Sequence, residues 1–172
     1  GSINGGAYTN TFLGIGCTLD ENWTYYSDEQ LLELNGLVAD AVQDEDIAQM
    51  LKDNEVIYDM YAAADDGMVS MNICFENLGV LYGTALDESS YIDMASENAV
   101  QALESMGYSS LSYEKKTVDF AGAERQCLAI TGTIQEVPCY EEVICIKEGN
   151  YMAVITLASF YENILEDMRG LF

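Results

Sequence analysis

The sequence contains no histidine among its 172 residues. Catalytic triads and dyads that use an imidazole as general base are therefore excluded, as are metal sites with histidine ligands. A cysteine nucleophile would need another base or a cationic neighbour to lower its pKa, and only 6 Lys and Arg residues exist to supply one. The missing histidine thus removes the commonest routes to hydrolytic or zinc-dependent catalysis.

Basic residues are scarce: 30 Asp and Glu outnumber 6 Lys and Arg, which gives a formal net charge of -24. Such a surface repels phosphate backbones and anionic lipid head groups, because nucleic-acid affinity rests largely on Lys and Arg releasing counterions. Nucleic acids are therefore disfavoured as partners. We expect the acidic residues to form a solvated surface, with recruitment of cations or of a basic partner as the alternative.

The sequence also has no Cys-x-x-Cys spacing among its 5 cysteines and no run of about 20 apolar residues, so redox motifs, zinc ribbons and membrane-spanning helices are not indicated. Several cysteines have apolar neighbours, as in Ile73-Cys74-Phe75 and Ile144-Cys145-Ile146. A free cysteine in such a setting behaves as a small hydrophobe. We therefore expect buried thiols.

The length of the chain suits one domain. We interpret the small-residue stretch 1–6 as a linker or a cloning remnant, and 7–172 as a single α+β domain. If a secretion signal or lipoprotein anchor preceded it, the glycine-rich start would be the tether between membrane and domain. This interpretation predicts a protein at the cell envelope or a secreted one.

Apolar patterns and turn residues predict the first elements. Strands are expected at 7–12, 13–19 and 23–26. Ser27 and Gln30 form a capping box that starts a helix, whose apolar spacing of three and four continues to about residue 53. Two extended runs, 56–64 and 68–76, flank an Asp-Gly turn and predict a hairpin. Ser89 or Ser90 is expected to cap a helix that reaches Met106.

Four strands are expected to close the sheet, at 111–120, 124–135, 140–147 and 151–159, before a short helix at 161–168. Their connections are too short for parallel crossovers, so they predict an antiparallel meander. Residues 143–146 and 152–157 are apolar on both sides, which places them centrally with helices over both faces. The element order predicts an α+β three-layer α/β/α sandwich around a mainly antiparallel sheet.

Four segments resemble the opening of PsbP-like domains: Tyr8-Thr9-Asn10, Phe12-Leu13-Gly14-Ile15, Trp23, and the helix start Ser27-Asp28-Glu29-Gln30-Leu31. Small extracytoplasmic lipoproteins of gut Firmicutes are similar. The resemblance implies an antiparallel sheet covered by helices and a function of docking onto larger assemblies. No catalytic motif is implied by it.

Three other features of the sequence are candidates for a metal, catalytic or contact site. Asp44-Glu45-Asp46 and Asp65-Asp66-Gly67 are the densest acidic clusters, but neither has EF-hand spacing, so we interpret them as a helix surface and a turn. Paired carboxylates would suit a glycosidase, but chance alone gives many such pairs here and Trp23 is the only tryptophan. A final set of tyrosines forms either a contact patch or half-buried strand positions: Tyr25, Tyr26, Tyr58, Tyr61 and Tyr140.

These observations predict a non-enzymatic, extracytoplasmic binding or adaptor domain, tethered as a lipoprotein, that contacts another protein of the cell envelope. One alternative is a small-ligand or calcium-binding domain, and another is a carboxylate-dependent hydrolase. The sequence assigns no catalytic, cofactor-binding or metal-binding residue and no cofactor.

Overall fold

The computed structural model describes residues 1–34 and 56–172, which form two antiparallel sheets with helices. The small sheet has the order β1 (Ser2–Asn4), β2 (Ala7–Asn10), β3 (Ile15–Thr18). The large, seven-stranded sheet has the order β4 (Trp23–Tyr25), β5 (Val56–Ala64), β6 (Val69–Asn77), β10 (Tyr151–Phe160), β9 (Val137–Glu148), β8 (Ala123–Ile134), β7 (Ser109–Phe120). The helices are α1 (Asp28–Leu34), α3 (Gly79–Ala85), α4 (Glu88–Ser105) and α5 (Leu165–Arg169), and the 3₁₀ turn η2 covers Asp65–Gly67.

The predicted meander is confirmed, since β7, β8, β9 and β10 pair in sequence order and antiparallel. The predicted hairpin is also present as β5 and β6, with positive φ at Asp65, Asp66 and Gly67 in its turn. The hairpin and the meander join through the pairing of β6 with β10, in which Ile73 lies opposite Ile155. This central pairing connects parts of the chain that are far apart in sequence.

One face of the large sheet packs against α4. Ile92 of α4 is buried with Leu128, Cys145 and Met152 of the sheet. The predicted serine cap is wrong by two or three residues: Asp87 is the N-cap, and its side chain accepts a hydrogen bond from the Ser90 amide at 2.7 Å. Aspartate is as good an N-cap as serine, and residue type alone therefore does not decide between Asp87 and the two serines.

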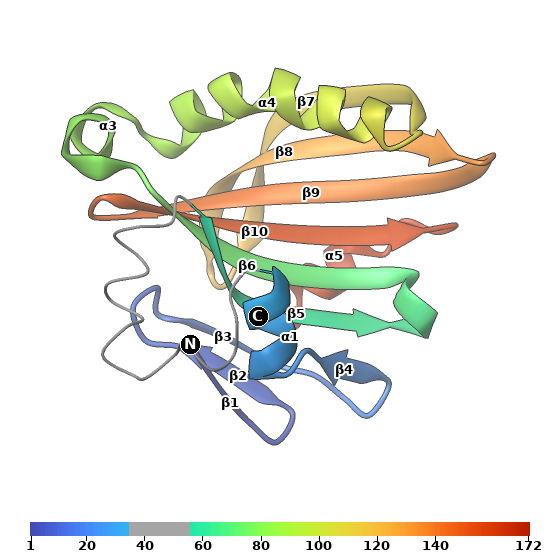
Figure 1. Cartoon of the computed structure of the whole chain (residues 1–172), viewed down its shortest axis with the longest axis horizontal. Coiled ribbons are helices and arrows are strands. Elements are labelled where there is room, and N and C mark those ends of the chain that lie inside the picture. The colour runs from blue at the N-terminus through green and yellow to red at the C-terminus, as the bar shows by residue number, and fades with distance from the viewer. Residues whose placement is uncertain (35–55) are drawn as a thin grey trace.

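The opposite face carries the larger core. Tyr8 and Ile15 of the small sheet and Met168 of α5 pack there against large-sheet residues that include Ile144 and Ile155. Figure 1 shows α4 on one side of the large sheet and β1, β2 and β3 on the other. The prediction of an α+β fold with mainly antiparallel sheet is confirmed, but strands as well as a helix cover this second face.

Several predicted boundaries differ from the structure. Residues 1–6, interpreted as a linker, include β1, which pairs with β2 through the turn at Gly5, where φ is positive. The last helix begins at Leu165 rather than 161, because Tyr161 has a φ of 68°. Both hydrogen bonds of the predicted capping box are present: the Ser27 amide donates to Oε1 of Gln30 at 2.9 Å, and the Gln30 amide donates to Oγ of Ser27 at 3.3 Å. The predicted extension of that helix from 35 to 53 lies outside the described residues.

Candidate binding sites

Helix α3 connects β6 to α4 and was not predicted from the sequence. Its inner side packs closely on the β9–β10 turn. A Cβ at position 83 would lie only 2.4 Å from Oδ1 of Asn150, so a side chain larger than that of glycine would clash there. The Leu78 amide also donates to the Asn150 carbonyl at 2.9 Å. Glycine at position 83 thus allows α3 to sit directly on this turn.

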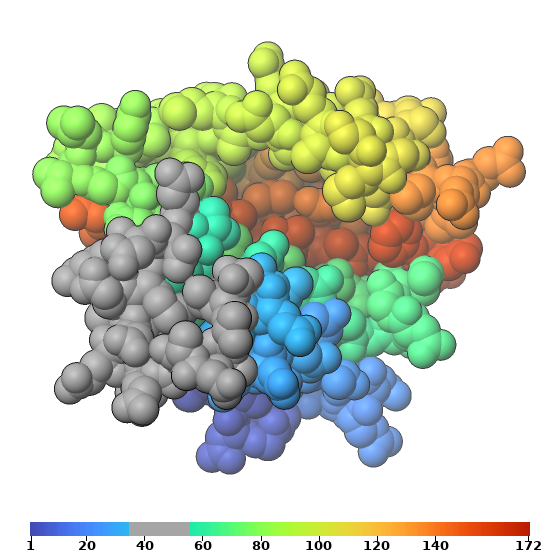
Figure 2. Space-filling model, viewed as in Figure 1, coloured from blue at the N-terminus to red at the C-terminus, as the bar shows by residue number. Residues whose placement is uncertain are grey.

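The outer side of α3 is apolar and exposed. Val80, Leu81 and Tyr82, together with Met94 of α4, have between 58% and 83% of their surface exposed. We call these four residues the α3 patch. Figure 2 shows α3 beyond one end of α4, on the outer surface of the molecule. Exposing several adjacent large apolar side chains to water costs free energy, and such patches mark interaction sites on soluble proteins.

A groove of about 540 Å³ lies beside the patch, between α3, α4 and the end of β6. Tyr82 and Met94 of the patch line it, and Leu78 and Leu86 add apolar surface. At one wall, the Tyr91 hydroxyl donates a hydrogen bond to Oε2 of Glu76. Burial and the Glu76 carboxylate raise the pKa of Tyr91, so this tyrosine stays a neutral donor.

Acidic residues lie close in sequence to the patch and to the residues that line the groove. Asp87, Asp93 and Glu97 are exposed on or beside α4. The backbone amide of Ser90 lowers the pKa of Asp87, which keeps this carboxylate charged. Lys115 pairs with Asp93 at 2.6 Å. Asp87 and Glu97 therefore add negative charge near the α3 patch, whereas the charge of Asp93 is compensated by Lys115.

A second concavity centres on Asp59. The register of β5 against β6 shifts between Tyr58 and Met60, which leaves Asp59 on a bulge. Its Oδ2 accepts hydrogen bonds from the Tyr8 hydroxyl at 2.5 Å and from Nδ2 of Asn10 at 3.1 Å. Tyr8 is 1% exposed and Asn10 is 3% exposed. Bulges re-aim side chains, and here the bulge directs a carboxylate toward the small sheet.

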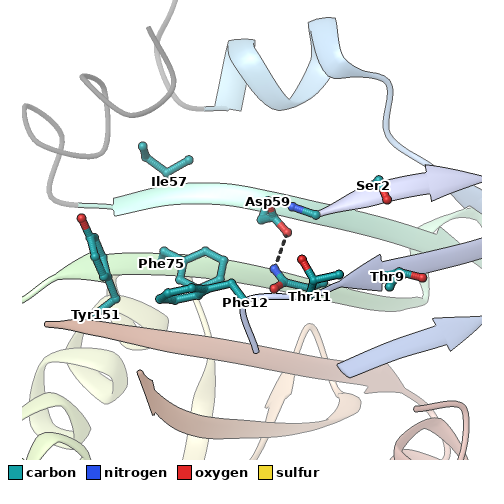
Figure 3. Close-up of a pocket in the computed structure, with 10 residues that line it drawn as sticks. Ser2, Thr9, Thr11, Phe12, Ile57, Asp59, Phe75 and Tyr151 are labelled. Atoms are coloured by element: carbon teal, nitrogen blue, oxygen red, sulfur yellow. Dashed lines mark hydrogen bonds and ion pairs between the residues drawn. The ribbon is translucent and has the colours of Figure 1, made fainter. Parts of the chain in front are cut away.

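Aromatic side chains form one wall of this Asp59 pocket, which has a volume of about 440 Å³. Phe12, 52% exposed, makes edge contacts with Phe75 at 5.9 Å and with Tyr151 at 6.0 Å between ring centroids. Figure 3 shows Phe12 and Phe75 next to each other, with Tyr151 on one side of them and Asp59 on the other. The pocket therefore combines an apolar wall with one carboxylate.

A buried ion cluster lies on the same face of the large sheet. Glu142 of β9 is buried and pairs with Lys116 of β7 at 2.8 Å and with Arg169 of α5. Burial and the Glu142 charge raise the pKa of Cys127 to about 12. This cluster attaches α5 to the sheet and has no adjoining cavity among those that the described residues line.

Of the acidic clusters singled out in the sequence, only Asp65-Asp66-Gly67 lies within the described residues, and it is not part of a metal site. Asp65-Asp66-Gly67 makes the hairpin turn, as predicted, and Asp44-Glu45-Asp46 lies outside the described residues. Within 1–34 and 56–172, no group of three or more Cys, Asp or Glu side chains is placed to hold a metal ion. The structure thus offers these residues no calcium site.

The tyrosines proposed as a contact patch do not share one surface. Tyr25 and Tyr140 pack against the larger core, whereas Tyr26 lies on Tyr61 with ring centroids 4.4 Å apart. Tyr61 points to the opposite face, because it alternates with the core residues Met60 and Ala62. The structure therefore contradicts a single tyrosine patch.

Buried thiols are confirmed for four of the five cysteines. Cys17, Cys127, Cys139 and Cys145 are buried, Cys74 is partly exposed, and all five are free. Trp23 is half-buried and packs against the larger core. None of these side chains lines the groove or the Asp59 pocket.

Sequence reasoning missed both concavities. Tyr8 and Asn10 carried the family resemblance, but their bonds to Asp59 depend on a bulge that only strand pairing reveals. The signal for α3 was weak, because its seven residues include two glycines and its N-cap residue, Leu78, has no side chain that can cap the helix. The apolar run Val80-Leu81-Tyr82 was the only feature that set the segment apart.

No protein-family model matches this sequence, and no curated protein matches it. The class that the fold defines is an α+β domain built on antiparallel sheets. None of the helices within the described residues has the length and apolar character needed to cross a bilayer.

Proposed function

We propose that this chain is a non-enzymatic binding or adaptor domain, outside the cytoplasm and tethered as a lipoprotein, that docks another protein of the cell envelope. The α3 patch is its docking surface, and the adjoining groove receives an apolar side chain of the partner. The observation that carries the proposal is the exposure of Val80, Leu81, Tyr82 and Met94 beside that groove.

The partner segment has apolar anchors flanked by Lys or Arg. Anchor side chains that fill pockets supply most of the binding energy at protein interfaces, and the groove has room for one. Asp87 directly follows the groove residue Leu86, Glu97 lies one helical turn from Met94 on α4, and the whole chain carries a net charge of -24. Complementary charge steers encounter and selects partners, so a basic segment fits this surface.

The family resemblance supports the proposal independently of the α3 patch. PsbP-like domains act by docking onto larger assemblies, and Tyr8-Thr9-Asn10 and Ser27–Leu31 carry the likeness. We propose that the two sheets and their helices form a PsbP-like version of the three-layer sandwich. An antiparallel large sheet with α4 on one face agrees with that family fold.

A carboxylate-dependent hydrolase is the less favoured function. Its mechanism needs two carboxyl groups facing one substrate. Among the described residues, Asp59 is the single acid lining its pocket and Glu76 is the single acid lining the groove. The geometry therefore favours binding over hydrolysis.

The test is selection from a random peptide library displayed on phage, followed by affinity measurement with synthetic peptides. We expect enriched peptides to carry a large apolar residue with flanking Lys or Arg. The double variant L81S/Y82S should lower their affinity by about tenfold or more, as loss of a hot spot does. The control M106S removes an equally exposed methionine outside the patch and should leave the affinity unchanged.

Two results would overturn the proposal. One is enrichment of peptides without basic residues or apolar anchors. The other is a set of peptides whose affinity is the same for L81S/Y82S as for the unmodified chain, or falls equally in M106S.

A further inference from the structure

The groove beside the α3 patch contains one acidic side chain, Glu76, near the end of β6. Its Oε2 accepts the hydrogen bond of the Tyr91 hydroxyl. Burial and this hydrogen bond raise the pKa of Tyr91, so the tyrosine is a neutral donor. The two side chains together therefore keep the charge of one carboxylate, and docking of an apolar anchor gives that charge no role.

The other oxygen of Glu76 is available to a ligand. Apart from the Tyr91 hydroxyl, no donor within residues 1–34 and 56–172 bonds to Glu76, and none of the ion pairs there includes it. Met152 lies opposite Glu76 on one side and Lys147 on the other, so this lysine is two strands away. Among the same residues, the one buried side-chain nitrogen or oxygen without a partner is Nε of Arg125, so Oε1 of Glu76 is open to solvent.

The walls beside Glu76 suit the aliphatic part of a long side chain. Tyr91, Met94 and Asn98 line the groove from α4, at the spacing of three and four residues that places them on one side of the helix. Tyr82 adds an aromatic ring from α3, and the exposed Asn98 offers a second oxygen acceptor. The volume of about 540 Å³ lies within the range of roughly 300–1,000 Å³ that holds whole small molecules, so one more side chain fits beside an apolar anchor.

Glu76 offers its charge in a form that favours an ammonium group over a guanidinium. A guanidinium binds a carboxylate best through two parallel hydrogen bonds, one to each oxygen. Tyr91 already uses an acceptor position on Oε2. An ammonium is a compact charge on a flexible aliphatic stem, and a bond to Oε1 alone is sufficient for it.

We propose that Glu76 receives the ammonium group of a lysine from the partner protein, with the aliphatic stem of that lysine along Met94 and Tyr82. This inference rests on the proposed docking function and assigns the partner's basic character to one contact inside the groove. The net charge of -24 attracts a basic segment, and Glu76 determines where its lysine binds.

Parallel selections from one random peptide library on phage test this assignment, with the unmodified chain, E76Q and E104Q as targets. E76Q keeps the shape of the side chain and an oxygen for the Tyr91 hydroxyl, but removes the charge. E104Q removes an exposed charge of α4 outside the patch and the groove. We expect lysine at a fixed spacing from the apolar anchor with the unmodified chain and with E104Q. With E76Q the anchor should remain and the lysine should be lost.

A peptide from the unmodified selection is then synthesised with lysine, norleucine or arginine at that position, and fluorescence anisotropy gives the affinities. Norleucine keeps a stem like that of lysine without the ammonium. It should weaken binding to the unmodified chain by about tenfold, because a charge-assisted hydrogen bond is lost, and change binding to E76Q little. Arginine should bind the unmodified chain more weakly than lysine.

The variant Y91F keeps the test decisive if E76Q disturbs the fold. The Tyr91 ring packs against the core beneath α4, and phenylalanine preserves that packing. Without the hydroxyl, both oxygens of Glu76 are available, so the affinity difference between the lysine and arginine peptides should shrink. An unchanged difference in Y91F would contradict the part assigned to the Tyr91 bond.

The inference and the proposed function can fail separately. If the affinity of the peptides falls in L81S/Y82S but E76Q selects the same lysine, or norleucine weakens binding equally in both proteins, the role of Glu76 is overturned and docking at the α3 patch stands. Enrichment of arginine in place of lysine would also overturn it. If no peptides are enriched, or their affinity ignores L81S/Y82S, the proposed function fails, and this inference fails with it.

Discussion

The hydroxyl of Tyr8 donates a hydrogen bond of 2.5 Å to Oδ2 of Asp59, 51 residues further along the chain. Tyr8 belongs to β2 of the small sheet and Asp59 to the bulge in β5 of the large sheet. The bond therefore connects the two sheets and holds the carboxylate at the edge of the aromatic pocket. A single hydrogen bond thus contributes both to the packing of the two sheets and to the shape of this pocket.

Replacing Tyr8 by Phe tests the structural part of this relationship. Y8F removes a donor from a buried network and should lower the free energy of unfolding by about 1–3 kcal/mol. Urea denaturation measures the change. Y113F removes the hydroxyl of an exposed strand tyrosine and serves as the control. Equal stability of the two variants would contradict a role for the Tyr8 hydroxyl.

Replacing Glu142 by Gln tests the buried ion cluster. E142Q leaves Arg169 and Lys116 without their charged partner and should destabilise the fold by about 3 kcal/mol, since breaking a buried pair leaves an uncompensated charge. The exposed Glu114 on β7 gives the control E114Q, which should change stability little. A loss below that of the control would show that Glu142 does not anchor α5.

The cysteine thiols should be protected in the native state. Burial, as the largest cause, raises the pKa of Cys127 and Cys145 from 9.0 to about 12 and that of Cys74 to about 11. Since the thiolate is the reactive form, iodoacetamide at pH 8 should modify these three slowly until the protein is unfolded in urea. Mass spectrometry follows the modification, and rapid labelling of folded protein would contradict the buried positions.

The same shifts predict how stability depends on pH. In the unfolded chain these thiols lose protons near pH 9, whereas in the folded chain they keep them to about 11–12. The folded state therefore binds more protons above pH 9, and the free energy of unfolding should fall as pH rises from 9 toward 12. Denaturation curves at pH 8 and pH 10.5 measure this. A more stable protein at pH 10.5 would contradict the shifts.

Gly83 should be needed for the position of α3. In G83A the new Cβ would lie 2.4 Å from Oδ1 of Asn150, so α3 must move away from the β9–β10 turn. We expect faster hydrogen exchange at the Leu86 amide, which bonds to the Tyr82 carbonyl, and weaker binding of groove-selected peptides. The control is Q101A, a change at an exposed position of α4 outside the α3 patch and the groove. Unchanged exchange in G83A would contradict this account of α3.

The parts of the fold that the sequence predicted are those with local causes. The Asp65-Asp66-Gly67 turn, the Ser27–Gln30 capping box and the short links of the meander each depend on residues close in sequence. The pairing of β6 with β10, the cover supplied by β1–β3 and the bulge at Asp59 depend on distant segments. No local pattern could predict them.

The proposed sites follow the same division. Large apolar residues such as Val80, Leu81 and Tyr82 are usually buried in a core. Here Gly83 faces Asn150, and these three side chains are exposed to solvent, which the sequence alone did not reveal. Glu76 is one of 30 acidic residues, and its contacts alone distinguish it. Composition left cationic partners open as an option, but it could not identify which carboxylates would meet them.

Site-specific photocrosslinking tests the central proposal most directly. The photoreactive amino acid p-benzoylphenylalanine is introduced in place of Leu81 in one protein and in place of Met106 in another, and each is irradiated with a groove-selected basic peptide. The account predicts a crosslinked product for position 81 and little or none for position 106, although both side chains are well exposed. Equal crosslinking at the two positions, or crosslinking at 106 alone, would contradict docking through the α3 patch.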